Sequence, residues 1–314
     1  MPPVKIGTRA SALARWQTDH LLSLWSTLEP ELDVQVVLLS SVGDDLPEAP
    51  LEVMEGTGFF TSTLERALLD GRIDVAVHSY KDLPTEATPG LAIAMVPERG
   101  PIEDTLCARD GMTLAQLPAG ARVGTSSPRR TAQLRALRPD LDYTTLRGNV
   151  PTRLGRVERG EMDAVVLARA GIVRLGLGDR ATEIFPVSQL LPAPAQGALA
   201  IQTRTESVAL RHRLAPLEHP PTRAAVLAER EVLHMLRGGC SVPVGAHAQV
   251  AGGHVTVDAG VFALEGSPVH RVTVSGISPQ IVGAEAARKL LDLGAGAILA
   301  ALDRTPRVSN GGRA

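Results

Sequence analysis

Arginine residues gather in one stretch of this sequence, in places where they could bind anions. Eight arginines lie between positions 121 and 156, where only Asp140 and Asp142 oppose them. Residues 127–128 read Ser-Pro, a typical helix start, so Arg129 and Arg130 should fall in the first turn. Cations there oppose the helix dipole, whereas free backbone N–H groups and guanidinium forks together favour carboxylate or phosphate. The stretch therefore predicts an anion site.

The same arrangement recurs at two other expected helix starts. Arg147 precedes a helix that should begin near residue 149 and carries Arg153, and Arg9 precedes Ser11, a candidate N-cap. The alternative is solvated surface arginine, which we favour for Arg135, Arg138, Arg156 and Arg159. An anion site is favoured for Arg9, Arg129, Arg130, Arg147 and Arg153.

The pair Lys81-Asp82 combines a rare cation with a lone carboxylate. Only three residues are lysine, and the pair follows a strand expected at residues 73–78. As a surface ion pair it would contribute little. As a carboxylate at the end of a core strand, Asp82 would stay ionised and could stabilise a cationic intermediate or move a proton. The residues alone leave both readings open.

The two cysteines have different surroundings. They are too few for a disulfide framework or a zinc cluster. Cys107 lies in an apolar run and is expected to be a small buried hydrophobe. Cys240 follows two glycines after an expected helix, so it should lie on a loop. There it could be an attachment point or a nucleophile.

The elements that must position these residues read as α/β over the first 200 positions. Strands are expected at 4–7, 33–40 and 73–78, with the second buried on both faces, and helices after Ser11 and at 63–70. Residues 122–125 echo 5–8, and residues 160–166 echo 71–77, in the same order. The echoes predict two similar α/β domains with a ligand cleft between them.

A third domain should follow the Pro/Gly-rich crossover at 186–198. A helix is expected at 222–236, strands at 244–250, 255–264 and 269–274, and a helix near 284–293. The expected domains are 1–98 with 198–217, then 103–192, then 220–303. Residues 304–314 should form a disordered tail.

Composition excludes several function classes. A formal net charge of -2 argues against nucleic-acid or anionic-membrane binding, and the eight aromatic residues offer little base stacking. No apolar run approaches the length of a membrane span, and the first residues lack a signal-peptide core, so we expect a cytoplasmic protein. There is no P-loop, H-E-x-x-H or G-x-S-x-G motif. Residues 176–181 match G-x-G-x-x-A but should form a turn.

Six motifs in collinear order resemble the porphobilinogen deaminase (hydroxymethylbilane synthase) family. They lie at 8–17, 76–84, 123–130, 146–154, 196–198 and 238–245, and the resemblance spans residues 4–303. The family joins four porphobilinogen molecules head to tail with loss of four ammonia molecules, and hydrolysis releases hydroxymethylbilane. The resemblance implies two periplasmic-binding-protein-like α/β domains, a smaller C-terminal α+β domain, and a monomer.

The resemblance also implies site residues. Cys240 would carry a dipyrromethane cofactor through a thioether. Asp82 would be catalytic, binding pyrrole N–H groups and stabilising the cation formed as ammonia leaves. The residues implied to bind the cofactor and substrate carboxylates, with one at the interdomain crossover, are Arg9, Ser11, Lys81, Thr125, Ser126, Ser127, Arg129, Arg130, Arg147, Arg153, Arg174 and, at the crossover, Gln196.

Three positions depart from the family pattern. Residues 55–58 lack the usual lysine and have Thr57, Val42 replaces a usual arginine, and Ala195 replaces a frequent glycine. Because of these changes, we expect the contacts between the lid loop and the incoming substrate to differ from the family pattern. A non-catalytic two-domain receptor for small anions is the alternative, but it explains neither Cys240 nor a third domain. A phosphoribosyltransferase-type enzyme should show acidic metal or ribose contacts, and no such motif is found.

Overall fold

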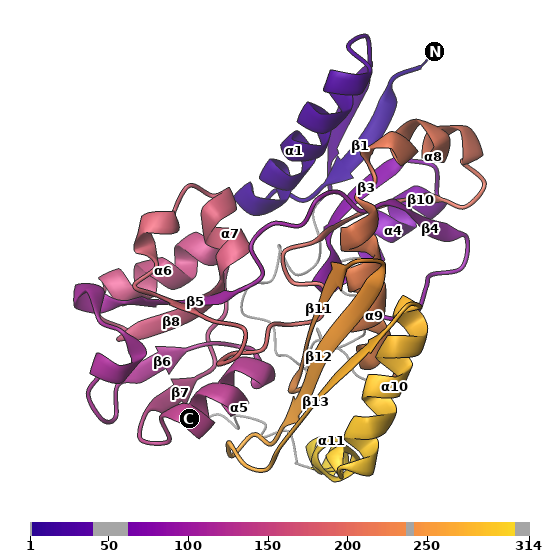
Figure 1. Cartoon of the computed structure of the whole chain (residues 1–314). Helices are drawn as coiled ribbons and strands as arrows, with labels where there is room; N and C mark the ends of the chain where they lie inside the picture. Colours follow the sequence, from indigo (N-terminus) through magenta and orange to yellow (C-terminus); the bar gives the residue numbers. More distant parts are fainter. Residues whose placement is uncertain (1, 40–61, 237–241, 305–314) are drawn as a thin grey trace.

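The chain forms three units, which we number in the order of their first strands (Figure 1). The computed structural model describes residues 2–39, 62–236 and 242–304, without the side chains of residues 62, 303 and 304. The predictions about the 43–58 loop, Val42, Thr57, Cys240 and the tail beyond residue 304 lie outside the described residues.

The first unit is a five-stranded sheet in the order β2-β1-β3-β10-β4. The first three strands are parallel, and β10 runs antiparallel to both of its neighbours. Helices α1 and α8 pack on one face and α4 on the other. The elements are β1 (Val4–Thr8), α1 (Ala12–Leu28), β2 (Val34–Leu38), α4 (Ser62–Leu69), β3 (Val75–Ser79), η1 (Tyr80–Asp82), β4 (Leu91–Met95), β10 (Leu199–Arg204), α8 (Val208–Leu214) and η5 (Ala215–Leu217).

The second unit repeats this strand order as β7-β6-β8-β5-β9. In both sheets the fourth strand is antiparallel and is reached by a crossing from the other unit, so the chain crosses twice. The prediction of two similar α/β units is confirmed. The elements are β5 (Asp104–Ala108), η2 (Arg109–Gly111), η3 (Leu114–Gln116), β6 (Arg122–Gly124), α5 (Pro128–Leu137), β7 (Asp142–Thr144), α6 (Val150–Glu158), β8 (Ala164–Ala168), α7 (Arg169–Arg174), η4 (Gly178–Arg180) and β9 (Glu183–Phe185).

The sequence echoes mark equivalent contacts in the two sheets. The backbone N–H of Lys5 donates to the Asp74 carboxylate at 3.0 Å, and that of Arg122 donates to Asp163 at 2.7 Å. In return, the Asp74 and Asp163 amides donate to the carbonyls of Lys5 and Arg122. Each aspartate therefore ties the start of its unit's central parallel strand to the segment that leads into the next strand.

The third unit is an antiparallel sheet, β11-β12-β13, covered on one face by α9 and α10. The three expected strands and both helices are present. One more helix, α11, was not expected, because residues 294–302 read only as a short Ala/Gly-rich run. The elements are α9 (Pro220–Met235), β11 (Val244–Ala251), β12 (His254–Phe262), β13 (Val269–Gly276), α10 (Pro279–Asp292) and α11 (Ala295–Arg304).

One strand prediction is wrong about burial. Residues 33–40 were expected to form a strand buried on both faces, but among the described residues β2 is the edge of its sheet and pairs only with β1. Val36 and Leu38 are 43% and 54% exposed. A run of apolar residues cannot distinguish an edge strand from a central one, because the neighbour that would cover it is set by topology.

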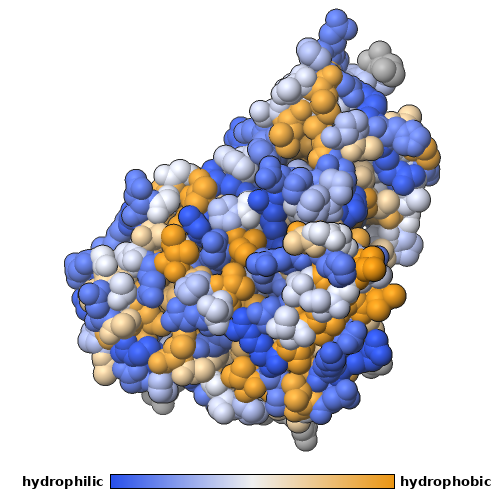
Figure 2. Space-filling model, in the orientation of Figure 1, coloured by the Kyte–Doolittle hydropathy of each residue, from blue (hydrophilic) through white to orange (hydrophobic). Residues whose placement is uncertain are grey.

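The face of the molecule seen in Figure 2 mixes hydrophilic and hydrophobic residues without one dominant apolar area. Within the described residues, none of the helices combines the length and apolar character needed to cross a membrane.

Candidate active site

Predicted residues of the first unit lie where parallel strands end. Ser11 caps α1 by accepting from the Ala14 amide at 3.3 Å, and Arg9 lies between β1 and this cap. Asp82 lies in η1, directly after β3. A hollow of about 100 Å³ is lined by Arg9, Ser11 and Asp82, together with His78 and other residues of this unit. The structure therefore brings these three predicted residues together.

The second unit presents its predicted residues at the matching edge. Ser127 is the N-cap of α5 in backbone terms, but its hydroxyl makes no capping bond. Thr125 accepts from the Ser127 amide at 3.2 Å instead. Ser126, between them, is exposed, so the Ser126 and Ser127 hydroxyls can serve a ligand.

The start of α6 forms as predicted. The Asn149 side chain caps α6 by accepting from the Thr152 amide at 2.9 Å, and Arg153 Nε donates to the Gly148 carbonyl at 2.7 Å. Arg147 is half-buried in the segment between β7 and this cap. Both arginines thus lie at the carboxyl edge of the second sheet.

Charges from the two units act on one another. Burial lowers the pKa of the Lys81 ammonium, while Asp82 and Asp104 raise it and Arg130 lowers it further. Burial, reinforced by Arg130 and opposed by Asp82, lowers the pKa of Arg153 to about 10. Asp82 of the first unit therefore lies within electrostatic reach of Arg153 of the second. Lys81, of the first unit, feels Asp104, Arg129 and Arg130 of the second, and we call this arrangement of charges the inter-unit site.

Arg129 and Arg130 are not simply exposed cations in a cleft. Their exposed fractions are 3% and 6%, and both pair with Asp104, which is fully buried at the start of β5. Arg129 Nη1 lies 2.7 Å from Asp104 Oδ2, and Arg130 reaches Oδ1 through Nε at 3.0 Å and Nη2 at 2.6 Å. Burial alone would raise the pKa of Asp104, but the two guanidinium groups hold it well below its usual range.

This pairing corrects the charge count made from the sequence. Only Asp140 and Asp142 were set against the arginines of residues 121–156. Asp104, in β5, also pairs with Arg129 and Arg130, and Asp163, just before β8, pairs with Arg122. No local signal marked these acids as their partners, because the contacts depend on strand order in the sheet.

Some polar atoms of the inter-unit site keep an unused bonding capacity among the described residues. Arg129 Nε and Gln196 Oε1 are buried without a hydrogen-bond partner. Gln196 Nε2 donates to the Ile102 carbonyl at 2.7 Å and to Asp104 at 3.0 Å. These bonds join the two crossovers, which are the segments between β4 and β5 (the first) and between β9 and β10 (the second). Buried orphan groups are costly, so a ligand with acidic and N–H groups suits this site.

Arg174 lies at the junction of the units. Its Nη2 donates to the Gly197 carbonyl at 2.6 Å, and its guanidinium lies 5.4 Å from the centre of the Trp16 ring. Burial lowers its pKa to about 10. In this structure it links α7, α1 and the second crossover.

Arg230, which no sequence motif indicated, supports the turn that carries Asp82. From α9 it donates to the backbone carbonyls of Tyr80 at 3.2 Å, Leu83 at 3.0 Å and Pro84. Its guanidinium also lies 4.5 Å from the centre of the Tyr80 ring. An arginine in a helix is common on surfaces, so no pattern could have identified this role.

Glu229, the neighbour of Arg230 in α9, connects the third unit to the second crossover through hydrogen bonds. Arg99 forms two bonds with its carboxylate, at 2.7 and 2.9 Å, and the amides of Ala195 and Ala248 donate to it at 2.6 and 2.8 Å. Ala195, one of the departures from the family pattern, has a left-handed backbone with φ of 61°. The helix α9 therefore contacts both the Asp82 turn and the crossover.

The two cysteines have different outcomes. Cys107 is 3% exposed in β5, and burial raises the pKa of its thiol, which confirms it as a buried hydrophobe. Cys240 lies outside the described residues, so its role as attachment point stays a prediction.

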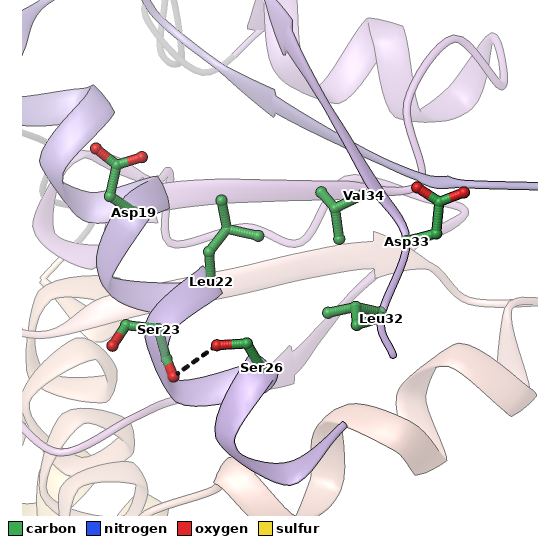
Figure 3. Close-up of a pocket in the computed structure, with 7 residues that line it drawn as sticks. All are labelled: Asp19, Leu22, Ser23, Ser26, Leu32, Asp33 and Val34. Atoms are coloured by element: carbon green, nitrogen blue, oxygen red, sulfur yellow. Dashed lines mark hydrogen bonds between the residues drawn. The ribbon is translucent and has the colours of Figure 1, made fainter. Parts of the chain in front are cut away.

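A second hollow, of about 530 Å³, lies between α1 and the start of β2 (Figure 3). Asp19 and Asp33 stand on its opposite sides, with Leu22 and Val34 between them. Two carboxylates without a lining cation repel acidic ligands, so this larger hollow does not suit the chemistry of the inter-unit site.

The fold and the site together define a class of protein. It is an α/β protein of two similar units with Asp82 facing the arginines of the second unit, and its third unit supports the turn that carries Asp82. Comparison with known families agrees. Residues 4–229 match the model described as "Porphobilinogen deaminase, dipyromethane cofactor binding domain", and residues 223–292 match "Porphobilinogen deaminase, C-terminal domain". The chain belongs to the porphobilinogen deaminase family.

Relatives match over nearly the whole length. The porphobilinogen deaminase of Thermobifida fusca is 47% identical over 95% of this chain and 96% of its own. That of Corynebacterium efficiens is 46% identical over 94% and 99%. That of Mycobacteroides abscessus is 46% identical over 94% and 99%. The alternative of a non-catalytic anion receptor has no comparable support.

Proposed function

We propose that this chain joins four porphobilinogen molecules head to tail at the inter-unit site and releases hydroxymethylbilane. Family membership over nearly the full length supports the activity. The observation that carries the site is the position of Asp82, which lies in one unit and within electrostatic reach of Arg153 of the other.

The described residues divide the work by charge. Asp82, exposed at the end of β3, accepts hydrogen bonds from pyrrole N–H groups and stabilises the positive charge that develops as ammonia leaves. Arg9, Arg147 and Arg153 bind acetate and propionate side chains at the strand ends, where Ser11, Ser126 and Ser127 add hydroxyl donors. Each pyrrole brings two carboxylates, so a growing chain needs many such donors.

The buried pair Arg129 and Arg130 has a narrower role. Their contacts with Asp104 leave Arg129 Nε as a donor without a partner among the described residues, so each arginine can offer a ligand only part of its fork. Lys81, near Asp82 and Asp104, supplies an ammonium donor. Thr125 and Gln196 shape the site. Arg174 reaches a carboxylate by exchanging its bond with the Gly197 carbonyl.

The orphan donor and acceptor at this site fit the dipyrromethane that the family model names, because that group carries both carboxylates and N–H groups. It supplies the covalent primer on which pyrrole units are added. Attachment through Cys240 rests on the resemblance of the 238–245 motif. We also propose a cytoplasmic monomer that acts on a small-molecule substrate and binds neither nucleic acid nor membrane.

Intact-protein mass spectrometry of the wild type and two single-cysteine variants tests this function. The wild type should exceed its sequence mass by two linked pyrrole units, and Cys240→Ser should not. The matched control is Cys107→Ser, which removes a buried thiol and should keep the excess mass. Adding porphobilinogen should produce further steps of one pyrrole unit.

Two results would contradict the proposal. An excess mass retained in Cys240→Ser would place the attachment elsewhere. A wild type that gains no pyrrole mass with porphobilinogen would favour the anion-receptor alternative, in which ligand binds without covalent growth.

A further inference from the structure

A chain of buried hydrogen bonds runs under the hollow of the first unit. His78 Nε2 lies 3.0 Å from Gln202 Oε1, and Gln202 Nε2 donates to Glu65 Oε1 at 2.9 Å. The Thr88 hydroxyl donates to the same carboxylate oxygen at 3.0 Å. His78, Gln202 and Glu65 are 3%, 4% and 8% exposed, so water cannot readily replace these bonds.

This chain sets which nitrogen of His78 carries a proton. Glu65 Oε1 accepts from both Gln202 and Thr88, so the NH₂ group of Gln202 lies on the side of Glu65. The opposite amide orientation would place two acceptors, Gln202 Oε1 and Glu65 Oε1, against each other. The amide oxygen therefore faces His78, and it also only accepts. His78 must be protonated at Nε2.

The other ring nitrogen is then a lone-pair acceptor. Burial lowers the pKa of His78 to about 4, although the bond to Gln202 opposes this shift, so the ring is neutral near pH 7. Among the described residues, Nδ1 has no hydrogen-bond partner, and His78 lines the hollow with Arg9, Ser11 and Asp82. A neutral acceptor of fixed orientation thus lies in the same hollow as the catalytic carboxylate.

We propose that His78 contacts the substrate directly, with Nδ1 accepting a hydrogen bond from an N–H group of porphobilinogen. This proposal rests on the proposed function and adds a residue to its site. An imidazole lone pair attracts N–H donors and repels carboxylate oxygens. His78 therefore orients the substrate, with an N–H group toward Nδ1 and its acidic side chains toward the arginines, among them Arg9 of the same hollow.

Two variants separate the two nitrogens. In His78→Gln, the longer amide can keep the bond to Gln202 but lacks an acceptor at the Nδ1 position. In His78→Asn, the shorter amide places an oxygen near the Nδ1 position and loses the buried bond. Loss of one neutral hydrogen bond should lower kcat/KM for porphobilinogen by about 3- to 10-fold in His78→Gln. His78→Asn should stay closer to the wild type in kcat/KM and be less stable to heat.

Activities are compared per molecule of loaded enzyme, counted by intact mass. The opposite order of the two variants, or an unchanged kcat/KM in both, would show that His78 only supports the fold. A wild type without deaminase activity would overturn the proposed function first, before any variant is compared, and this contact with it.

A second measurement reads the tautomer without relying on activity. Nitrogen-15 NMR of histidine-labelled wild type at pH 7 should show the signals of a neutral ring protonated at Nε2 that are missing from the spectrum of His78→Gln. Gln202→Leu removes the bond to the amide without altering the hollow, and it should let the ring populate both tautomers. A wild-type ring protonated at Nδ1, or at both nitrogens, would overturn the proposal.

Discussion

Replacing Asp104 with asparagine tests the buried centre of the inter-unit site. The substitution keeps the size of the side chain but removes the charge that balances Arg129 and Arg130, whose nitrogens approach to 2.7 and 2.6 Å. Breaking a buried ion pair from one side costs about 3–5 kcal/mol, because the partner charge stays buried and unbalanced. Two such charges remain here, so we expect the upper part of this range.

Thermal and urea unfolding measure the effect. At the roughly 2–4 °C per kcal/mol typical of proteins of about 150–250 residues, a loss of about 4–5 kcal/mol should lower the melting temperature by roughly 8–20 °C. The matched control is Asp140→Asn, which breaks a pair with Arg138 at 2.7 Å whose carboxylate is 40% exposed. It should stay close to the wild type, because exposed pairs contribute little. Equal destabilisation by the two substitutions would refute the argument from burial.

Acid should reduce the difference between the wild type and Asp104→Asn. The folded pKa of Asp104 lies below its ordinary value of 3.8, so its stabilising contribution is complete above that value. The contribution is lost as the pH falls from 3.8 toward the folded pKa. Unfolding free energies should therefore differ by a constant amount at neutral pH and converge in acid. A difference that grows below pH 4 would contradict the sign of this shift.

Three other substitutions test the supports of the site. Arg230→Met should lower kcat more than it raises KM, because the Asp82 turn loses the guanidinium that donates to its backbone carbonyls. Arg223→Met, on the same helix, is the kinetic control. Gly197→Ala should destabilise the protein by more than about 1 kcal/mol in urea unfolding, because φ is +84° and a Cβ would lie 2.6 Å from a backbone oxygen. Ala195→Gly should remove the strain of a left-handed backbone at φ 61°. The free energy of unfolding should rise by about 1 kcal/mol, and the melting temperature should rise with it. A normal kcat in Arg230→Met, a stable Gly197→Ala or a less stable Ala195→Gly would each contradict its premise.

The sequence by itself determined many of the local elements that position the candidate site. The caps at Ser11 and Asn149 follow from residues within a few positions of each other. Hydrogen bonds at helix starts involve the next three residues, so their signals are local. The apolar pattern of residues 73–78 likewise predicted the strand after which Asp82 lies.

Only the tertiary structure decided which distant groups meet. Asp104 balances two arginines that follow it by some twenty-five positions, and Arg230 holds a turn about 150 positions earlier in the chain. His78 depends on Gln202, 124 positions away. β10 brings Gln202 beside β3, and α9 brings Arg230 to the Asp82 turn. Such pairs leave no periodic trace, because partners are chosen by the order of strands in a sheet and not by neighbours along the chain.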